Sequence, residues 1–373
     1  MRRISGYIHE LDHWTSFTWE AEKVMGPLAE TRNLQGRLLG KMQSLGFELQ
    51  REAVLSTLTL DVIKSSEIEG EIFDLAQVRS SVARRLGMDL AGAIASDRYV
   101  DGVVEMMLDA TQYYEQLVTE DRLFGWHAAL FPTGWSHLYK ITVGAWRKDE
   151  KGPMQVVSGA MGNEKVHYQA PGAERIPQEM QVFLSWLNAE SDIDLVLKAA
   201  IAHFWFISIH PFEDGNGRMA RAITDMVLAR SDKSPQRYYS MSAQIRIERK
   251  QYYEALEKAQ KGTSDITEWV LWFLSCLGRS IQSAEQTLEH ILHKAEFWRI
   301  HADVVLNERQ HKFVNRLLDG FEGHLTSSKW AKMSRCSQDT ALRDIQDLIH
   351  KNILQKDSSG GRSTHYTLVE LKG

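Results

Sequence analysis

The chain has 373 residues, of which 43% are hydrophobic and 25% charged, a composition that suits two or three globular domains and excludes a fibrous, collagen-like or disordered chain. It contains 44 Lys and Arg against 49 Asp and Glu, so the net charge is −5 and the composition does not indicate a broad surface for a polyanion such as nucleic acid.

Residues 17–90 are expected to form helices joined by short turns, because apolar residues recur at the 3.6-residue period, as in the amphipathic run 52–64. Between residues 147 and 176 the pattern changes, since glycines and prolines punctuate two short β-like runs, 155–157 and 165–168. These runs predict a β-hairpin, which either only connects helices or offers an edge strand with which a peptide can pair.

Residues 192–209 are apolar at nearly every position, so we expect a helix that is buried all round at the centre of the core. A second apolar stripe follows at helical spacing, over Met219, Ala222, Ile223, Met226 and Val227. Two buried helices are therefore expected to flank one short glycine-containing loop.

From about residue 307 the sequence predicts a separate small module. Its helices are expected at 313–318, 327–333 and 337–351, and its strands at 353–355 and 365–369 around a turn at 357–361. This order of elements is typical of a winged helix-turn-helix.

The charges of this module leave its partner open. Residues 301–373 contain 11 Lys and Arg against 9 Asp and Glu, a net charge of +2. Three acidic residues on the predicted third helix disfavour an approach to phosphates, namely Asp339, Asp344 and Asp347. Lys356 and Arg362 on the wing favour it. The candidates are duplex DNA, another protein, or a second copy of the chain in a homo-oligomer.

The cysteines and the apolar segments indicate a cellular location. Cys276 and Cys336 lie far apart and form no C-x-x-C pair, which excludes disulfide scaffolds and cysteine-only zinc sites and favours a reducing compartment. The N-terminal residues lack the apolar core of a signal peptide, and the longest apolar stretch, 193–212, is interrupted by Asp194 and Lys198. We therefore expect a soluble cytoplasmic protein that does not enter a membrane.

The segment 210–221 combines residue types that phosphate chemistry needs. His210 follows the buried helix and, with an ordinary pKa of about 6.5, can accept a proton as a general base. Asp214 offers oxygen ligands suited to Mg²⁺. Gly215 and Gly217 allow backbone N–H groups to approach an anion where the next helix begins and its dipole is positive.

Two arginines complete this segment. Arg218 and Arg221 are three residues apart on the predicted second helix, on the face away from its apolar stripe. Both guanidinium groups can therefore hold phosphate oxygens with bidentate geometry. A base, a metal ligand and an anion clamp within one short segment predict a site for phosphate transfer.

Residues 210–221 match the Fic motif H-P-F-x-[D/E]-G-N-G-[R/K]-x-x-R at every specified position. The chain thus resembles the Fic-domain protein adenylyltransferases, which transfer AMP from ATP to Ser, Thr or Tyr hydroxyls of target proteins and of themselves. The resemblance implies that His210 is the base and that Asp214 holds Mg²⁺. It assigns the α- and β-phosphates to Gly215, Asn216, Gly217 and Arg218, and the γ-phosphate to Arg221.

A second motif lies upstream. Residues 65–70 fit the inhibitory motif of the same family, [S/T]-x-x-x-E-[G/N], through Ser65, Glu69 and Gly70. The resemblance implies that Glu69 pairs with Arg221 and takes the guanidinium that should hold the γ-phosphate. ATP would then bind in an unproductive orientation, which makes the enzyme autoinhibited.

The resemblance also extends to regions without specific motifs. The hairpin over 154–169 resembles the flap on which the target protein docks, and Tyr252 and Tyr253 lie in a segment that resembles the adenine pocket, although these tyrosines can equally be core residues. The implied fold is mainly α: a Fic-type helical core with a β-hairpin flap, an N-terminal helical extension and a C-terminal winged helix-turn-helix. The corresponding domains are an N-terminal helical region, 1–115, a catalytic domain, 116–300, and the winged helix, 301–373.

Three alternative functions stay open at this stage. Glu69 could orient water for removal of AMP from a modified protein, which would make the chain a hydrolase. A phosphoryl transfer from a reversed nucleotide is disfavoured by the intact Arg218 and Arg221. The third alternative is a DNA-binding regulator in which the motif only senses nucleotide.

Overall fold

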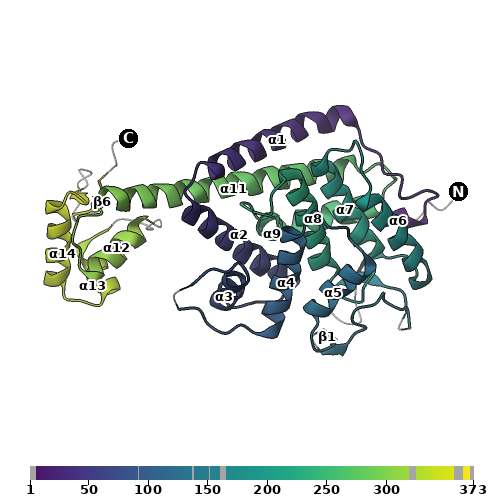
Figure 1. Cartoon of the computed structure of the whole chain (residues 1–373), viewed down its shortest axis with the longest axis horizontal. Coiled ribbons are helices and arrows are strands. Elements are labelled where there is room, and N and C mark those ends of the chain that lie inside the picture. Colours follow the sequence, from purple (N-terminus) through teal and green to yellow (C-terminus); the bar gives the residue numbers. More distant parts are fainter. Residues whose placement is uncertain are drawn as a thin grey trace. The chain divides into compact units, whose positions relative to one another are not determined.

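The structure is a computed structural model and describes residues 6–90, 92–136, 138–150, 152–159, 165–318, 325–356 and 364–369. This part of the chain is mainly helical with short strands, as predicted (Figure 1). The chain divides into two compact units, Met1–Ala284 and Glu285–Gly373, and each is described by itself. Among the described residues, no helix is both long enough and apolar enough to span a membrane.

Three helices of the first unit, which begin at residues 75, 98 and 120, follow residues typical of helix N-termini. The side chains of Asp74, Asp97 and Thr119 accept hydrogen bonds from backbone N–H groups two or three residues later. The elements are η1 (Ile8–Glu10), α1 (Ala21–Gln43), α2 (Phe47–Ile68), α3 (Leu75–Arg85), α4 (Arg98–Gln112) and α5 (Glu120–Leu130). The helices predicted within 17–90 are therefore confirmed.

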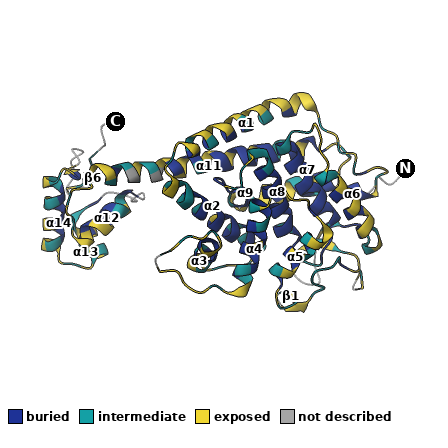
Figure 2. Ribbon diagram, viewed as in Figure 1, coloured by how far each residue is buried: buried dark blue, intermediate teal, exposed yellow. Residues whose placement is uncertain are grey.

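The centre of the first unit is a pair of helices, α7 (Leu195–Ile209) and α8 (Asn216–Asp232), which pack against each other (Figure 1). α7 is buried from Val196 to Ile209, as its continuous apolar sequence predicts (Figure 2). α6 (Ile176–Asn188) covers part of α7. The loop between α7 and α8 is thus held by two helices that have little freedom to move.

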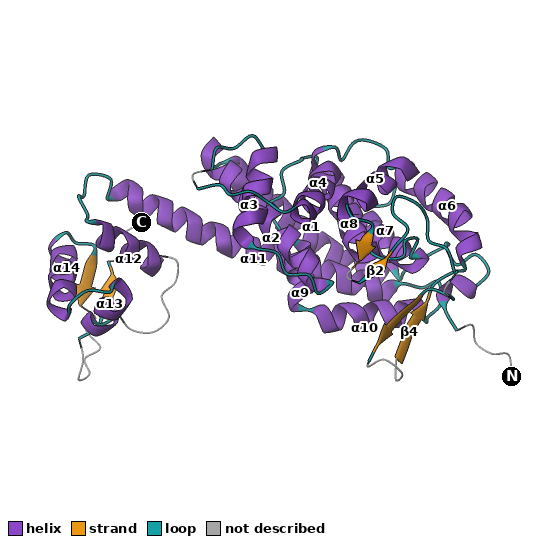
Figure 3. Cartoon of the chain, turned by 90° about the horizontal axis from the view of Figure 1, so that it is seen from below, coloured by secondary structure: helices purple, strands orange, loops and turns teal. Residues whose placement is uncertain are grey.

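Two antiparallel hairpins precede these helices. β1 (Trp135–Ser136) pairs with β2 (Tyr139–Lys140), and β3 (Gln155–Ser158) pairs with β4 (Lys165–Gln169). The second is the predicted hairpin. His167 Nδ1 lies 2.6 Å from Glu257 Oε2 on α10 (Arg249–Gln260), and the Tyr168 hydroxyl donates to the Ser208 carbonyl over 2.7 Å, so β4 is tied to two helices (Figure 3). Residues 160–164 of the predicted flap lie outside the described residues.

A buried set of charged residues joins α2 to α8. Arg237 is 2% exposed and donates to Asp225 over 3.0 Å and to Asp232 over 2.8 Å, both on α8. Asp61 on α2 accepts from the Ser240 hydroxyl over 2.5 Å. Burial and the neighbouring Asp61 raise the pKa of Asp225 well above its ordinary value. α9 (Met241–Ile247) begins directly after this set and packs along α2.

The second unit contains the predicted order of three helices followed by two strands. These elements are α12 (Glu308–Leu318), α13 (Ser327–Ser334), α14 (Gln338–His350), β5 (Leu354–Lys356) and β6 (Tyr366–Leu368). The unit also includes the end of α11 (Thr267–Ile300). Its core is centred on Trp330, which is fully buried and stacks on Phe313 with ring centroids 4.0 Å apart. The wing turn 357–361 and Arg362 lie outside the described residues, so the winged helix stays a prediction.

The three acidic residues of α14 do not all lie on its outer face. Asp344 is 6% exposed and accepts from Arg309 and Asn307 beside α12. Asp347 accepts from Gln310 on α12 over 2.8 Å. The charge that disfavours an approach to phosphates is therefore reduced on the outer face of α14, where Asp339 is exposed.

Candidate active site

The loop between α7 and α8 has a fixed backbone. His210 ends α7 in the left-handed conformation, with φ of 51°, and Gly215 precedes α8 with φ of 80°. Arg147 donates from Nε to the His210 carbonyl over 2.8 Å. Asn216 closes the loop, because its side chain accepts from the Phe212 N–H over 3.0 Å and donates to the Phe212 carbonyl over 2.8 Å. The Asn216 amide is thus engaged in the loop itself.

The hydrogen bonds of His210 suit a general base. Its Nδ1 lies 3.2 Å from the Ile207 carbonyl, which can only accept, so Nδ1 bears the proton and Nε2 has a free lone pair. Burial lowers the pKa of His210 to about 4. The ring is therefore neutral near pH 7 and Nε2 is available to take a proton.

Asp214 is oriented by hydrogen bonds at both carboxylate oxygens. The Gly215 N–H donates to Oδ1 over 2.6 Å and the Ser136 hydroxyl of β1 donates to Oδ2. His127 Nδ1 accepts from the Gly144 N–H, so its Nε2 donates to the Asp214 carbonyl over 3.2 Å. Burial lowers the pKa of His127 to about 4, which keeps this ring neutral too.

The donor set around Asp214 fits Mg²⁺. No cluster of three or more His, Cys, Asp or Glu that could hold a metal occurs in the described part of the chain. Mg²⁺ is usually held by one or two carboxylates together with substrate phosphates and water, so a single carboxylate beside an anion cradle is sufficient. Asp214 is the residue that would hold it.

The N-terminus of α8 offers backbone donors that have no partner within the helix. The first helical hydrogen bond runs from the Met219 N–H to the Gly215 carbonyl, and Gly215 has no side chain to cap the N–H groups of residues 216–218. Such donors form an anion site together with the helix dipole. A Cβ at Gly217 would lie 2.1 Å from Glu69 Oε1, so only glycine lets this carboxylate approach the cradle.

Arg221 contacts the end of α2 through Nε and Nη2, whereas its buried Nη1 has no partner among the described residues. Its Nε donates to the Ser65 hydroxyl over 2.8 Å, and its Nη2 donates to the Ser65 carbonyl over 2.9 Å and to Glu69 Oε1 over 2.8 Å. Burial opposes the charge, but Glu69 compensates and the pKa of Arg221 is raised. The contact between Glu69 and Arg221 that the upstream motif implies is therefore present.

Arg218 pairs with a residue that sequence reasoning did not single out. Its Nη1 donates to Glu71 Oε2 over 2.7 Å, and its guanidinium lies 5.0 Å from the centre of the Phe131 ring. The Arg218 side chain is 2% exposed, and its Nε has no acceptor among the described residues. Both arginines of the segment thus lie buried beside carboxylates.

The end of α2 explains how two carboxylates reach two arginines. Glu69 is the C-cap of α2, and Gly70 follows in the left-handed region with φ of 89°. The Glu71 N–H then donates to the Ser66 carbonyl over 3.0 Å. Arg249 Nε donates to the Ile68 carbonyl over 3.1 Å and fixes this last turn to α10.

The two tyrosines of the predicted adenine pocket differ in position. Tyr252 is 1% exposed, and its hydroxyl lies 2.9 Å from His203 Nε2. Tyr253 is 37% exposed, and the Arg249 guanidinium lies 5.2 Å from the centre of its ring. Tyr252 is therefore a core residue, whereas Tyr253 is accessible to a ligand.

Several functional neighbours of the site escaped sequence reasoning. Glu71 had a visible signal, because it is a second carboxylate two residues after Glu69. Ser136, His127 and Arg147 had no such signal, because their roles depend on distances between separate elements.

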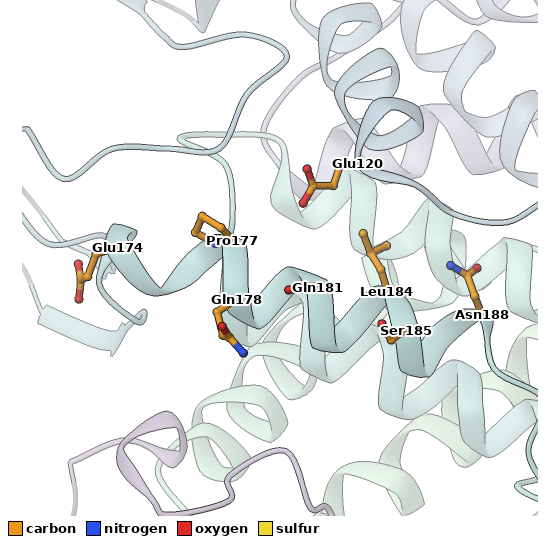
Figure 4. A pocket seen from close by; sticks show the side chains of 8 residues that line it. All are labelled: Glu120, Glu174, Pro177, Gln178, Gln181, Leu184, Ser185 and Asn188. Carbon is orange, nitrogen blue, oxygen red and sulfur yellow. The ribbon is translucent and has the colours of Figure 1, made fainter.

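A cavity of about 680 Å³ lies along α6 and is lined by none of the predicted site residues. Figure 4 shows its lining side chains, which are those of Glu120, Glu174, Pro177, Gln178, Gln181, Leu184, Ser185 and Asn188.

Family models match two segments of the chain. Residues 7–88 match a domain of unknown function (DUF4172), and residues 117–228 match the Fic/DOC family. A protein adenylyltransferase Fic from Culex quinquefasciatus is 26% identical over 231 residues, which are 59% of this chain and 40% of that relative. One from Drosophila melanogaster is 27% identical with the same coverage. The chain thus spans about two fifths of the length of these curated relatives.

Two solved structures have a similar fold. A Fic family protein from Desulfovibrio desulfuricans G20 aligns with a TM-score of 0.53 at 22% identity, over 95% of this chain and 98% of that one. A Fic domain containing signaling protein from Bacteroides thetaiotaomicron aligns with a TM-score of 0.50 at 22% identity, over 68% and 96%. At this identity the likeness concerns the fold alone.

Proposed function

We propose that this chain, which contains a Fic domain over residues 117–228, is a protein adenylyltransferase that transfers AMP from ATP to Ser, Thr or Tyr hydroxyls of target proteins and of itself. The observation that carries the proposal is the neutral His210, whose free Nε2 belongs to the same loop as Asp214 and the unpaired N–H groups of α8. The names of the curated relatives support the same activity.

The chemistry follows from these groups. His210 Nε2 accepts the proton of the target hydroxyl, whose oxygen forms a bond to the α-phosphorus of ATP while pyrophosphate leaves. The N–H groups at the start of α8, with Arg218, stabilise the negative charge on the phosphates. Bound Mg²⁺, held by Asp214, would neutralise phosphate charge. The flap 154–169 would pair with an extended segment of the target, and Val157 on β3 and Val166 on β4 are exposed.

Autoinhibition by Glu69 is part of the proposal. Its carboxylate lies on Arg221, the residue assigned to the γ-phosphate, and beside Gly217. While this pair persists, a triphosphate has to bind without the Arg221 guanidinium. The α-phosphate is then displaced from the position in which a hydroxyl can attack it.

Labelling with α-labelled ATP and Mg²⁺ tests the proposal. Glu69→Gly should label the protein itself or lysate proteins well above wild type, and Glu69→Gly with His210→Ala should remove that label. Equal labelling of these two variants would contradict the role of His210. Label from γ-labelled ATP would indicate phosphoryl transfer, and release of AMP from a modified target that depends on Glu69 would indicate the hydrolase.

A second candidate function concerns the second unit. Because Asp344 and Asp347 face α12, the outer face of α14 exposes Arg343 and Gln346, with Asp339 beside them. Such a face favours duplex DNA more than the sequence alone indicates. The full chain should then shift a DNA duplex in a salt-dependent manner, and Arg343→Ala should weaken the shift. Lys312→Ala, on an exposed pair of α12, serves as the control.

A further inference from the structure

The last turn of α2 brings one carboxylate to each arginine of the loop segment. Glu69 lies 2.8 Å from Arg221 and Glu71 lies 2.7 Å from Arg218, and each arginine side chain is 2% exposed. The two arginines are three residues apart on α8 and therefore one helical turn apart. The two glutamates are separated by Gly70, whose left-handed backbone lets both side chains extend to the same helix. Glu69 accounts for only one of these pairs.

We propose that Glu71 is a second inhibitory carboxylate, which competes with the β-phosphate of a nucleotide for Arg218. This inference rests on the proposed function, which assigns the α- and β-phosphates to the N-terminal turn of α8 and to Arg218. Glu71 therefore controls how tightly the diphosphate part of the ligand binds. Glu69 acts on the γ-phosphate through Arg221, and it reaches the cradle only at Gly217.

The surroundings of Arg218 support this competition. Its guanidinium is held over the Phe131 ring, so it is already positioned, and its buried Nε has no acceptor in the part of the chain that the structure describes. A buried guanidinium requires an anionic partner. When Glu71 leaves, a phosphate oxygen is the natural replacement, because it offers the same charge-assisted geometry as the carboxylate.

Removal of Glu69 alone is expected to free only one of the two arginines. Glu69 and Glu71 flank one glycine on one helical turn, which Arg249 ties to α10. Displacement of this turn frees both arginines together, whereas removal of Glu69 alone leaves Arg218 paired. The variant Glu69→Gly is therefore only partly released, and Glu69→Gly with Glu71→Gln should label faster than Glu69→Gly.

ADP distinguishes the two carboxylates because it lacks a γ-phosphate. Isothermal titration calorimetry with Mg²⁺-ADP should give about tenfold tighter binding to Glu71→Gln than to wild type, and less than about twofold change for Glu69→Gln. Glu71→Ala, which also removes the hydrogen bond, should follow Glu71→Gln. Glu67→Gln is the matched control, because Glu67 lies on the same turn and pairs with Lys64 and Arg246 instead. Thermal unfolding of each variant checks that it is folded.

The outcomes separate this inference from the proposed function. ADP affinity that stays within about twofold of wild type in both Glu71 variants would overturn the inference, as would equal tightening by Glu69→Gln. Absence of ADP and ATP binding in every folded variant would overturn both proposals. The expected ADP pattern without any AMP transfer would overturn the adenylyltransferase assignment and leave the competition for Arg218 standing.

Discussion

At the scale of single residues, His210 is the group whose protonation state decides the chemistry. Because burial lowers its pKa to about 4, the ring stays neutral at pH values at which an ordinary histidine is largely protonated. An ordinary pKa of about 6.5 would leave roughly 3% of the base form at pH 5. The difference is large enough to measure.

We therefore expect AMP transfer by Glu69→Gly to change by less than about twofold between pH 8 and pH 5, rather than by about thirtyfold. A rate that falls with a midpoint near pH 6.5 would contradict the lowered pKa. The free energy of unfolding should be measured at the same pH values by circular dichroism, because His210 binds a proton more readily in the unfolded chain than in the folded one. The lowered pKa thus makes the folded state less stable as pH falls from about 6.5 towards 4.

The effect of Gly217→Ala on the free energy of unfolding depends on whether Glu69 is present. In wild type, Gly217→Ala places a Cβ 2.1 Å from the Glu69 carboxylate and should lower the free energy of unfolding by about 1–3 kcal/mol. In the Glu69→Gly background the contact with the carboxylate is gone and only Arg221 Nη1, 3.2 Å from the Cβ, stays close, so the helix propensity of alanine should bring the change to within about 1 kcal/mol of zero. Urea unfolding of the four proteins measures this coupling, and equal effects in both backgrounds would refute it.

At the scale of elements, Arg237 is the cation that pairs with the two buried carboxylates of α8, Asp225 and Asp232. Replacement by Met leaves the buried Asp225 and Asp232 without their cation, and we expect a loss of about 3–5 kcal/mol in the free energy of unfolding. Lys23→Met, which removes an exposed ion pair with Glu20 at the start of α1, should leave the free energy of unfolding nearly unchanged. Urea denaturation compares the two variants, and similar losses would show that the buried carboxylates do not depend on Arg237.

Most of the helices and strands could be predicted from the sequence, but the contacts between them could not. A continuous apolar run predicted α7. Apolar periodicity predicted α8 and the helices within 17–90, because a helix with one buried face needs a 3.6-residue repeat. Glycine and proline punctuation predicted the hairpin of β3 and β4. The pair of Glu71 and Arg218 depends on how α2 ends relative to α8, which no local pattern encodes. No local pattern predicts that the Asp344 side chain faces α12 either, because its orientation is set by the packing of α14 on α12.

At the scale of the whole molecule, each of the two units has its own core. Trp330→Ala removes the centre of the second core and should destabilise that unit by about 3–5 kcal/mol. Calorimetry should show one transition shifted to lower temperature and another, from the first unit, unchanged. Leu342→Ala is the control, because Leu342 is 39% exposed on α14. A single transition that shifts as a whole would show that the units unfold together.

At position 210, where the backbone is left-handed, histidine is required for activity whereas glycine would be more stable. A residue with a Cβ costs roughly 1–2 kcal/mol in this conformation, and glycine would avoid most of that cost. Saturation mutagenesis of position 210 screened only for heat resistance should therefore recover His210→Gly, and the recovered protein should be more stable and lack its base. Retention of histidine at this position in an evolving lineage would then be a sign that the reaction itself is under selection.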